Sequence, residues 1–328
     1  MDSCELPRVA DFTFATCLPG LEPMLKLDVA RTRPELRFAY SRPGLITFKS
    51  ERTITADDVP ATALARVWGR SIGPARSPDD AAHQLRMMGA DRIHVFARDP
   101  DGPVDLSSWQ NATSASNEPA KPGEVVADVI VSDNEPAWLG LHRADDHHAR
   151  WPGALVPAIV PDDAPSRAYA KIEEAIAWAE LDVAADQVSL EIGCAPGGAM
   201  LALARRGLDV WGVDTADVAP IVLAEPRVHH LAIKVGALRW EELPPRVDWL
   251  LVDVNLAPQV ALHEVARLMP KLKSSLRGAV ITLKLNDDAI VAELPKLVER
   301  IRGFGFTDVR LRHLPSNRRE LCCVAQRA

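Results

Sequence analysis

The feature that most constrains the fold is a glycine-rich turn between an apolar run and a helix-forming run, at residues 190–201 (LEIGCAPGGAML). Val188, Leu190 and Ile192 suit a buried strand, and the alanine- and leucine-rich residues after the turn favour a helix. Glycines at the carboxyl end of a strand let backbone N–H groups approach an anionic or carboxylate-bearing molecule at a helix N-terminus. The stretch therefore predicts a ligand site at the carboxyl edge of a sheet.

Segments with strand and helix character alternate through residues 166–328. This alternation predicts a doubly wound, mostly parallel sheet with helices on both faces, whose last strand runs antiparallel. After a helix that begins at Ser166, we expect strands at 188–192, 209–213, 228–233, 249–252, 279–284, 309–314 and 321–325, and helices at 198–206, 258–268 and 288–302.

The segments before residue 147 begin in the order β-α-β-β-α-β, which is typical of a ferredoxin-like domain. The expected strands are 12–17, 36–40, 45–48 and 67–72, with helices at 21–30 and 59–67. A helix at 78–88, capped by Ser77, and strands at 92–97, 125–131 and 137–142 follow, around an exposed loop at 99–123. A proline-rich stretch at 147–165 predicts a linker, so the expected domains are 1–146 and 166–328.

Composition excludes several classes of protein. The net charge of −7 gives no global basic field, so any surface for nucleic acid must be local. Five cysteines without a CxxC pair argue against a disulfide framework and a zinc knuckle. The sequence lacks a membrane-length apolar run, and the acidic Asp2 and Glu5 stand where a signal peptide is basic, so we expect a cytoplasmic protein. The only metal-like cluster, residues 145–148 (DDHH), is adjacent in sequence and is interpreted as a solvated loop, with no metal site.

The glycine spacing distinguishes between nucleotides. A dinucleotide site reads G-x-G-x-x-G, whereas this turn reads E-x-G-x-x-x-G-G and resembles the first motif of class I S-adenosylmethionine-dependent methyltransferases. Asp214 ends the next expected strand, where an acid can accept both ribose hydroxyls of a nucleoside. The alternative is a structural turn with an incidental acid. The resemblance implies S-adenosylmethionine as cofactor, bound by Glu191, Gly193, Cys194, Ala195, Pro196, Gly197, Gly198, Asp214 and Asp253.

A proline inside the turn narrows the resemblance to the FtsJ-type RNA ribose 2′-O-methyltransferases. Residues 166–174 (SRAYAKIEE) are similar to the helix that precedes the cofactor domain in that family and carries the first member of a Lys-Asp-Lys-Glu tetrad. The resemblance implies four catalytic residues, with surface salt bridges as the alternative reading of each. They are Lys171, Asp253, Lys284 and Glu320.

Short motifs in the N-terminal half resemble the RlmM-type enzymes, which methylate a cytidine ribose in large-subunit ribosomal RNA. These motifs are residues 16–22 (TCLPGLE), 41–44 (SRPG), 139–143 (LGLHR) and 151–153 (WPG). The resemblance implies an α+β ferredoxin-like and THUMP-like RNA-positioning domain before an α/β, Rossmann-like class I methyltransferase domain. The chain departs from the FtsJ-type pattern at Ala199, where an aromatic residue is usual, and at 235–238, where an acid is absent.

The chemistry itself requires residues of these types. A ribose hydroxyl is a poor nucleophile near neutral pH, so its proton must be removed and its oxygen held in line with the methyl group. A lysine acts as base when burial and a neighbouring cation depress its pKa, while carboxylates oppose that shift. We therefore expect Lys284 to be the base, Lys171 and Glu320 to hold the ribose and the lysine, and Asp253 to bridge lysine and cofactor.

Weaker features each leave two interpretations open. Arg310, Arg312, Arg318 and Arg319 form either a phosphate-binding patch or a solvated sheet end. Trp109 either stacks on a base or packs on its own domain. Cysteines 194, 322 and 323 are either redox-active or small buried residues.

The sequence thus predicts an enzyme that methylates ribose 2′-hydroxyl groups in RNA, with ribosomal RNA as its partner and no membrane or metal. One alternative keeps the chemistry but moves it to transfer RNA, messenger RNA or a small-molecule hydroxyl. Another is a non-catalytic RNA-binding protein that retains the fold. The sequence does not indicate an oligomeric state.

Overall fold

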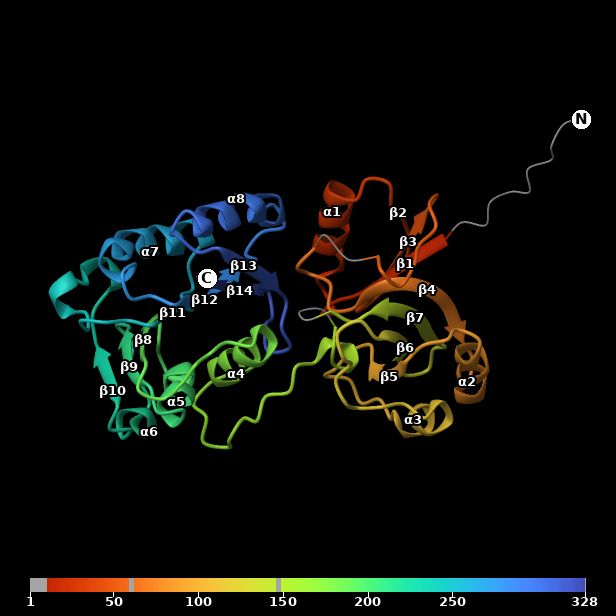
Figure 1. The fold of residues 1–328 in the computed structure, drawn as a ribbon, viewed down its shortest axis with the longest axis horizontal. Coiled ribbons are helices and arrows are strands. Elements are labelled where there is room, and N and C mark those ends of the chain that lie inside the picture. Colours follow the sequence, from red (N-terminus) through yellow and green to blue (C-terminus); the bar gives the residue numbers. More distant parts are fainter. Residues whose placement is uncertain (1–10, 59–61, 146–148, 328) are drawn as a thin grey trace, which may run out of the picture. The chain divides into compact units, whose positions relative to one another are not determined.

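The computed structural model describes residues 11–58, 62–145 and 149–327. The chain divides into two compact units, Met1–Leu155 and Val156–Ala328. Each unit contains a seven-stranded sheet with its own helices (Figure 1). The division lies inside the stretch expected to be a linker.

The first unit has the sheet order β2-β3-β1-β4-β7-β6-β5. Strand β3 lies between β1 and β2, which α1 connects, and this is the split β-α-β arrangement of ferredoxin-like folds. The elements are β1 Asp11–Thr16, α1 Glu22–Thr32, β2 Arg37–Arg42, β3 Leu45–Ser50, β4 Trp68–Ala75, α2 Pro78–Arg86, β5 Arg92–Ala97, α3 Ser107–Thr113, β6 Val125–Val131, β7 Ala137–Arg143 and a 3-10 turn at Pro152–Ala154.

The helix expected at 59–67 is wrong over 62–67, while 59–61 lie outside the described residues. The backbone N–H groups of this segment bond to the end of β1. The Arg66 N–H donates to the Thr16 carbonyl at 2.7 Å, and the Val67 N–H donates to Thr16 Oγ1 at 3.0 Å. Residues 64–68 are all buried without a break, which does not suit a surface helix with one exposed face.

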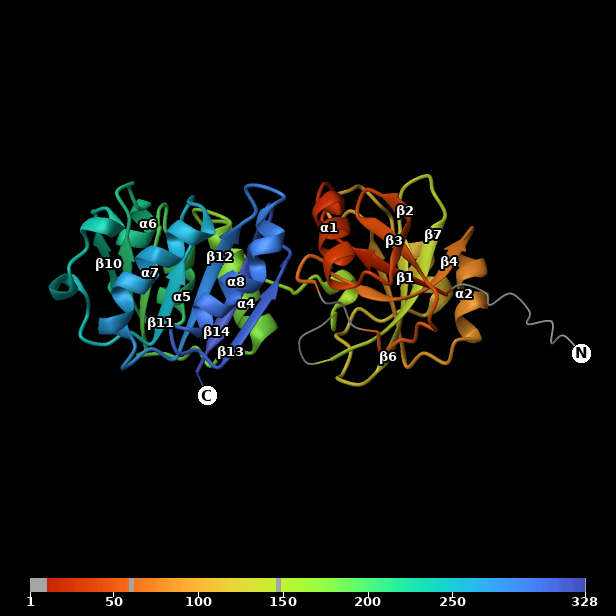
Figure 2. The same ribbon diagram turned by 90° about the horizontal axis from the view of Figure 1, so that it is seen from above.

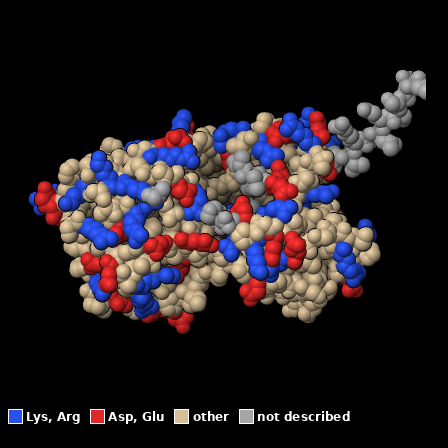
Figure 3. Space-filling view, in the orientation of Figure 1, with Lys and Arg blue, Asp and Glu red and all other residues tan. Residues whose placement is uncertain are grey.

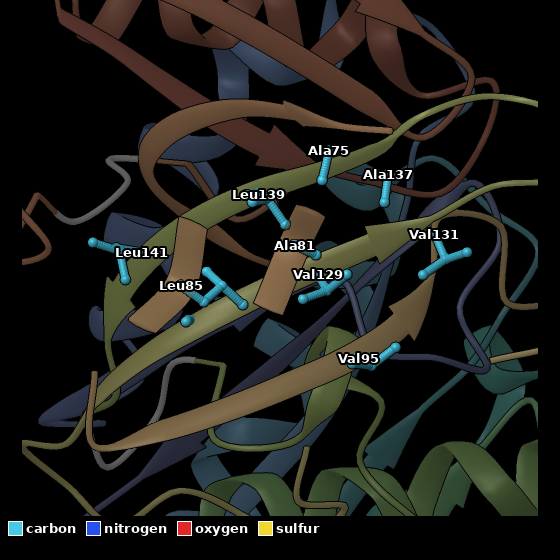
Figure 4. Packing of buried hydrophobic residues seen from close by; sticks show 10 residues of the cluster. Ala75, Ala81, Leu85, Val95, Val129, Val131, Ala137, Leu139 and Leu141 are labelled. Atoms are coloured by element: carbon cyan, nitrogen blue, oxygen red, sulfur yellow. The ribbon is translucent and has the colours of Figure 1, made fainter. Parts of the chain in front are cut away.

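The expected loop at 99–123 contains a short helix, α3, and Trp109 of this helix packs on the core of the first unit. That core lies between α2 and strands β5, β6 and β7 (Figure 4). Ala81 and Leu85 of α2 meet Val95, Val129 and Leu139, and Ser77 caps α2 by accepting the Asp80 N–H. Packing on this core, rather than base stacking, is therefore the role that the structure gives to Trp109.

The second unit has the sheet order β10-β9-β8-β11-β12-β14-β13. Strands β10, β9, β8, β11 and β12 are parallel, and β14 runs antiparallel to both β12 and β13, as expected for the last strand. The elements are α4 Ala168–Ala179, β8 Val188–Ile192, α5 Gly198–Arg205, β9 Asp209–Val213, α6 Pro220–Leu223, β10 Val228–Leu231, β11 Trp249–Val252, α7 Pro258–Leu272, β12 Gly278–Lys284, α8 Ile290–Arg302, β13 Asp308–Arg312 and β14 Glu320–Gln326, with 3-10 turns at Val235–Ala237 and Trp240–Glu242.

Helices cover both faces of this second sheet. Figures 1 and 2 show α7 and α8 on one face and α4 and α5 on the other. The predicted α/β, doubly wound, Rossmann-like class I architecture is confirmed for this unit. Strand order reverses between β8 and β11, and in such sheets ligands bind at the carboxyl ends of the strands beside that reversal. No helix among the described residues is long and apolar enough to cross a membrane.

Candidate active site

The glycine turn after β8 is packed tightly from both sides. Gly193 has φ +82°, and a Cβ there would lie 2.6 Å from the carbonyl oxygen of Asp253. A Cβ on Gly198, the first residue of α5, would lie 2.3 Å from Ser166 Oγ. Only glycine permits these approaches. The turn therefore lies directly against the end of β11 and the start of α4.

Asp214, just after β9, holds the same turn from a third side. Its Oδ2 accepts the Ala195 N–H at 3.1 Å and its Oδ1 accepts the Ala216 N–H at 2.9 Å. Each carboxylate oxygen has a second lone pair, and the residue is partly exposed. Asp214 thus fixes the turn and still has acceptor capacity for hydroxyl groups at the carboxyl edge of the sheet.

Burial shifts the pKa of three cysteine thiols and of Glu191, the acid that precedes the turn. Burial raises the pKa of the thiols of Cys194 and Cys322, and raises the pKa of Cys323 to about 12. Reactive thiolates need a depressed pKa, so these groups are small core residues. Burial, and then the charges of Asp253 and Asp214, raise the pKa of Glu191 well above its ordinary range. This shift favours the protonated, neutral form of Glu191 over the carboxylate.

Glu191 borders a small cavity. Its side chain is 1% exposed, and its Oε2 has no hydrogen-bond partner among the described residues. The cavity, of about 30 Å³, is also bordered by Lys171, Asp253 and Asn317, and by Ala199, where FtsJ-type enzymes usually have an aromatic residue. A polar space of this size holds a water molecule. The structure thus places Glu191, predicted as a cofactor contact, in a buried position around the same cavity as Lys171 and Asp253.

The four tetrad side chains come together at the carboxyl edge of the sheet. Lys171 projects from α4, Asp253 follows β11, Lys284 ends β12 and Glu320 begins β14. Lys171 Nζ lies 2.9 Å from Asp253 Oδ2 and 2.6 Å from Glu320 Oε1. Lys284 Nζ lies 2.8 Å from Asp253 Oδ1 and 2.7 Å from Glu320 Oε2. Cations and anions therefore alternate around a closed ring, and each is at most 21% exposed.

The electrostatics of the tetrad contradict one expectation. Burial raises the pKa of Asp253 and Glu320, but the two lysines lower it further, so both carboxyls end below their ordinary range. Burial lowers the pKa of Lys284, yet its bonds to Asp253 and Glu320 raise it above its ordinary value. The expected depression of the Lys284 pKa is therefore wrong for this state, because each lysine contacts two carboxylates.

Two further residues support the tetrad, although sequence reasoning gave them no role: Asn317, three residues before Glu320, and Glu174, in the motif at 166–174. The buried Asn317 accepts the Leu314 N–H at 2.9 Å and donates to Glu320 Oε1 at 3.4 Å. Glu174 accepts the backbone N–H and the hydroxyl of Ser316 at 2.9 and 2.6 Å. Glu174 follows Lys171 by three residues on one helix face, and this spacing is the signal that would have found it.

A larger cavity of about 460 Å³ adjoins Lys284, between the starts of α7 and α8. Pro258 lines this cavity, whereas Asn255, which lies closer to Asp253 in the sequence, does not. A pocket of this size accepts a nucleoside-sized ligand. The other lining residues are Ala257, Gln259, Asn286, Asp287, Ala289, Ile290, Ala292 and Glu293.

Only two of the four arginines considered as a phosphate-binding patch are exposed. Arg312 is buried, and Arg310 is occupied by the Ala179 carbonyl, Gln326 and Asp308, so neither belongs to an open surface. Arg318 and Arg319 are exposed. The face in Figure 3 shows both signs of charge interspersed. Among the described residues no cluster of three or more metal-ligating side chains occurs, and Asp146, His147 and His148 lie outside that part of the chain.

Comparison with known proteins identifies the family. No protein-family model matches the chain. The ribosomal RNA large subunit methyltransferase M of Halorhodospira halophila is 30% identical over 307 residues, which cover 90% of this chain and 81% of that protein. The proteins of the same name from Pseudomonas syringae pv. syringae and Azoarcus sp. are 31% and 29% identical, and cover 64% and 61% of this chain. The chain belongs to the ribosomal RNA large subunit methyltransferase M family.

The matches span only 60% and 56% of the lengths of the Pseudomonas and Azoarcus proteins. Among solved structures, TrmN from Thermus thermophilus aligns over 97% of this chain and 100% of that one, with 15% identity and a TM-score of 0.36. The fold assignment rests on the strand order and not on this similarity.

The raised pKa of Glu191 leads to a prediction about stability. An acid with a raised pKa in the fold binds more protons folded than unfolded, so it weakens the fold as pH rises above its unfolded pKa. Glu191→Gln removes that effect. We expect the variant to match or exceed the wild type in unfolding free energy from about pH 5 to 8, and to lose any advantage near pH 4, in urea titrations.

The exposed Glu241 supplies the matched control, because Glu241→Gln changes the same charge without burial. A loss of more than about 2 kcal/mol at pH 7 in Glu191→Gln alone would show instead that Glu191 is an ionised, paired carboxylate.

Proposed function

We propose that the chain is an S-adenosylmethionine-dependent enzyme that methylates the 2′-oxygen of a ribose in RNA, with ribosomal RNA as its substrate class. The observation that carries the proposal is the closed Lys171-Asp253-Lys284-Glu320 tetrad beside the glycine turn. Family membership supports the substrate class, because the relatives are named for ribosomal RNA. A chance surface salt bridge does not account for four side chains from four elements with low exposure.

The turn and the acids around it fit the proposed cofactor. Residues 193–198 offer backbone groups at the edge where parallel α/β sheets bind nucleotides. Asp214 keeps lone pairs for the two ribose hydroxyls, and Asp253, which contacts both lysines, follows β11 at the same edge. S-adenosylmethionine supplies an electrophilic methyl group carried on a sulfonium. The chain contributes the binding surface and the groups that prepare the attacking oxygen.

The tetrad prepares that oxygen for attack on the methyl group. Lys284 is the one tetrad member that also lines the 460 Å³ cavity, so a ribose bound there lies within reach of its Nζ. A hydroxyl that takes the place of one carboxylate around Nζ removes an interaction that raises the pKa of Lys284, while burial continues to lower it. Lys284 then accepts the hydroxyl proton, and Lys171 and Glu320 hold the ribose and the lysine in place.

The direct test is incubation of the chain with labelled S-adenosylmethionine and total RNA from a strain that lacks the gene, followed by nucleoside analysis. A labelled 2′-O-methylnucleoside in the ribosomal RNA fraction supports the proposal. Label in transfer or messenger RNA, or in a small molecule, would move the same chemistry to another substrate. Absence of both label and calorimetric cofactor binding would favour a non-catalytic RNA-binding protein.

Substitution of Lys284 separates a base from a fixed cation. Arginine keeps the charge but does not deprotonate in proteins, so both Lys284→Arg and Lys284→Ala should lose about 10²- to 10⁴-fold in rate. Cofactor affinity measured by calorimetry should change little. A Lys284→Arg variant with more than about a tenth of the wild-type rate would assign Lys284 a purely electrostatic role.

The raised pKa of Lys284 also sets the pH dependence. Because only the neutral amine accepts a proton, log kcat/KM should rise by about one for each pH unit between roughly pH 6 and 9. Initial rates with saturating cofactor measure this slope. A profile that is flat across the range would contradict proton transfer to Lys284.

Asp214 is expected to contribute to cofactor affinity through charged hydrogen bonds. Asp214→Asn should weaken S-adenosylmethionine binding by at least about tenfold in calorimetry, since such bonds contribute roughly 1.5–3 kcal/mol. The exposed Asp217 provides the matched control, and Asp217→Asn should bind as the wild type does. Equal affinity in the two variants would remove Asp214 from the cofactor site.

A further inference from the structure

The first unit contains a second, larger cavity of about 640 Å³ on one face of its sheet. Side chains alternate along a strand, so Val129 and Leu139 point to the α2 core while Ile130 and Trp138 point to the opposite face. Ile130 and Trp138 line the cavity. The cavity therefore lies on the sheet face opposite α2, across β2, β3, β1, β4 and β7.

Two aromatic side chains and an arginine form a layered wall of this cavity. The rings of Tyr40 and Trp138 stack with centroids 5.6 Å apart and an interplanar angle of 14°. The Arg42 guanidinium lies 4.9 Å from the centre of the Tyr40 ring. The Trp138 indole N–H donates to Ser71 Oγ at 2.9 Å, which fixes the orientation of the indole. The wall is thus in place before any ligand enters.

The charges on the cavity favour an anion. Among the described residues that line it, Arg42, Arg98 and Glu135 are the charged ones. Arg98 Nη1 lies 2.6 Å from Glu135 Oε2, and Arg42 Nε lies 3.8 Å from Glu135 Oε1. One carboxylate faces two guanidinium groups, so the lining has a net charge of about +1. This positive charge is local, as the acidic chain as a whole requires.

We propose that this cavity binds unpaired nucleotides of single-stranded RNA, with a base against the aromatic wall and a phosphate beside Arg42 and Arg98. Single-stranded RNA is recognised through bases that stack on aromatic rings and on arginine, in grooves with positive charge. A duplex keeps its bases stacked inside and offers none to such a wall. The inference goes beyond the proposed methyl transfer, and depends on the proposed function only in that RNA is the substrate class.

The test uses the full chain and fluorescence anisotropy with a labelled 12-nucleotide oligo(rA), and with a duplex of the same length. Tyr40→Ala and Arg42→Gln should each weaken single-strand binding by at least about fivefold, because one stacked base contributes roughly 5- to 150-fold. Arg42 is half exposed, so its replacement does not threaten folding. Tyr40→Phe, which keeps the ring, should restore most of the affinity.

The same strand supplies matched controls outside the cavity. Phe38 and Arg37 are exposed residues of β2 that do not line it, and Phe38→Ala and Arg37→Gln should bind as the wild type does. Affinity that is equal in Tyr40→Ala and Phe38→Ala, or that is as high for the duplex as for the single strand, would overturn the proposal.

Calorimetric measurement of cofactor binding distinguishes failure of the cavity proposal from failure of the proposed function. Cofactor binding should be unchanged in all these variants, because none lies in the second unit. A chain that binds oligo(rA) through Tyr40 but transfers no methyl group would refute only the enzyme. If the chain methylates RNA but Tyr40→Ala binds oligo(rA) as tightly as the wild type does, only the proposed RNA-binding role of the cavity is refuted.

Discussion

The alternation of two lysines and two carboxylates is the interaction on which the second unit depends at its functional edge. Each partly buried charge has two opposite neighbours, so the tetrad as a whole is neutral. Removal of one partner would leave uncompensated charge in a poorly solvated place, which is the costly case for buried ions. The arrangement also requires a particular topology. Because β14 runs antiparallel to β12, its first residue Glu320 pairs with Lys284, the last residue of β12.

The ion pairs that make the tetrad neutral also set the pKa of Lys284. The contacts that stabilise the tetrad are those that hold the pKa of Lys284 above its ordinary value, so the resting state favours a protonated lysine. In the proposed mechanism, a reactive amine requires that one of these contacts be exchanged for the substrate. Asn317 donates to Glu320, and Glu174 accepts from the hydroxyl of Ser316, so hydrogen bonds outside the tetrad hold the segment that leads into Glu320.

Much of the second unit was predictable because local preference and periodicity agree there: strand 188–192 was expected at its observed bounds, and β9 and β11 likewise. The tetrad was found through resemblance, since its members lie far apart in sequence and no periodic pattern connects them. Contacts from distant residues account for the errors. Thr16 takes the N–H groups of Arg66 and Val67, and two carboxylates reverse the shift expected for Lys284. Nothing in the sequence near those positions reports such partners.

The position of β14 determines when the tetrad becomes complete as the sheet forms. This strand follows β13 in the chain but lies between β12 and β13 in the sheet. Until it inserts, Glu320 is absent from the tetrad and two lysines share the single carboxylate of Asp253. Completion of the sheet and completion of the tetrad are therefore one event. A partly folded chain that already has the glycine turn still lacks the full tetrad, because Glu320 pairs with Lys284 only when β14 is in the sheet.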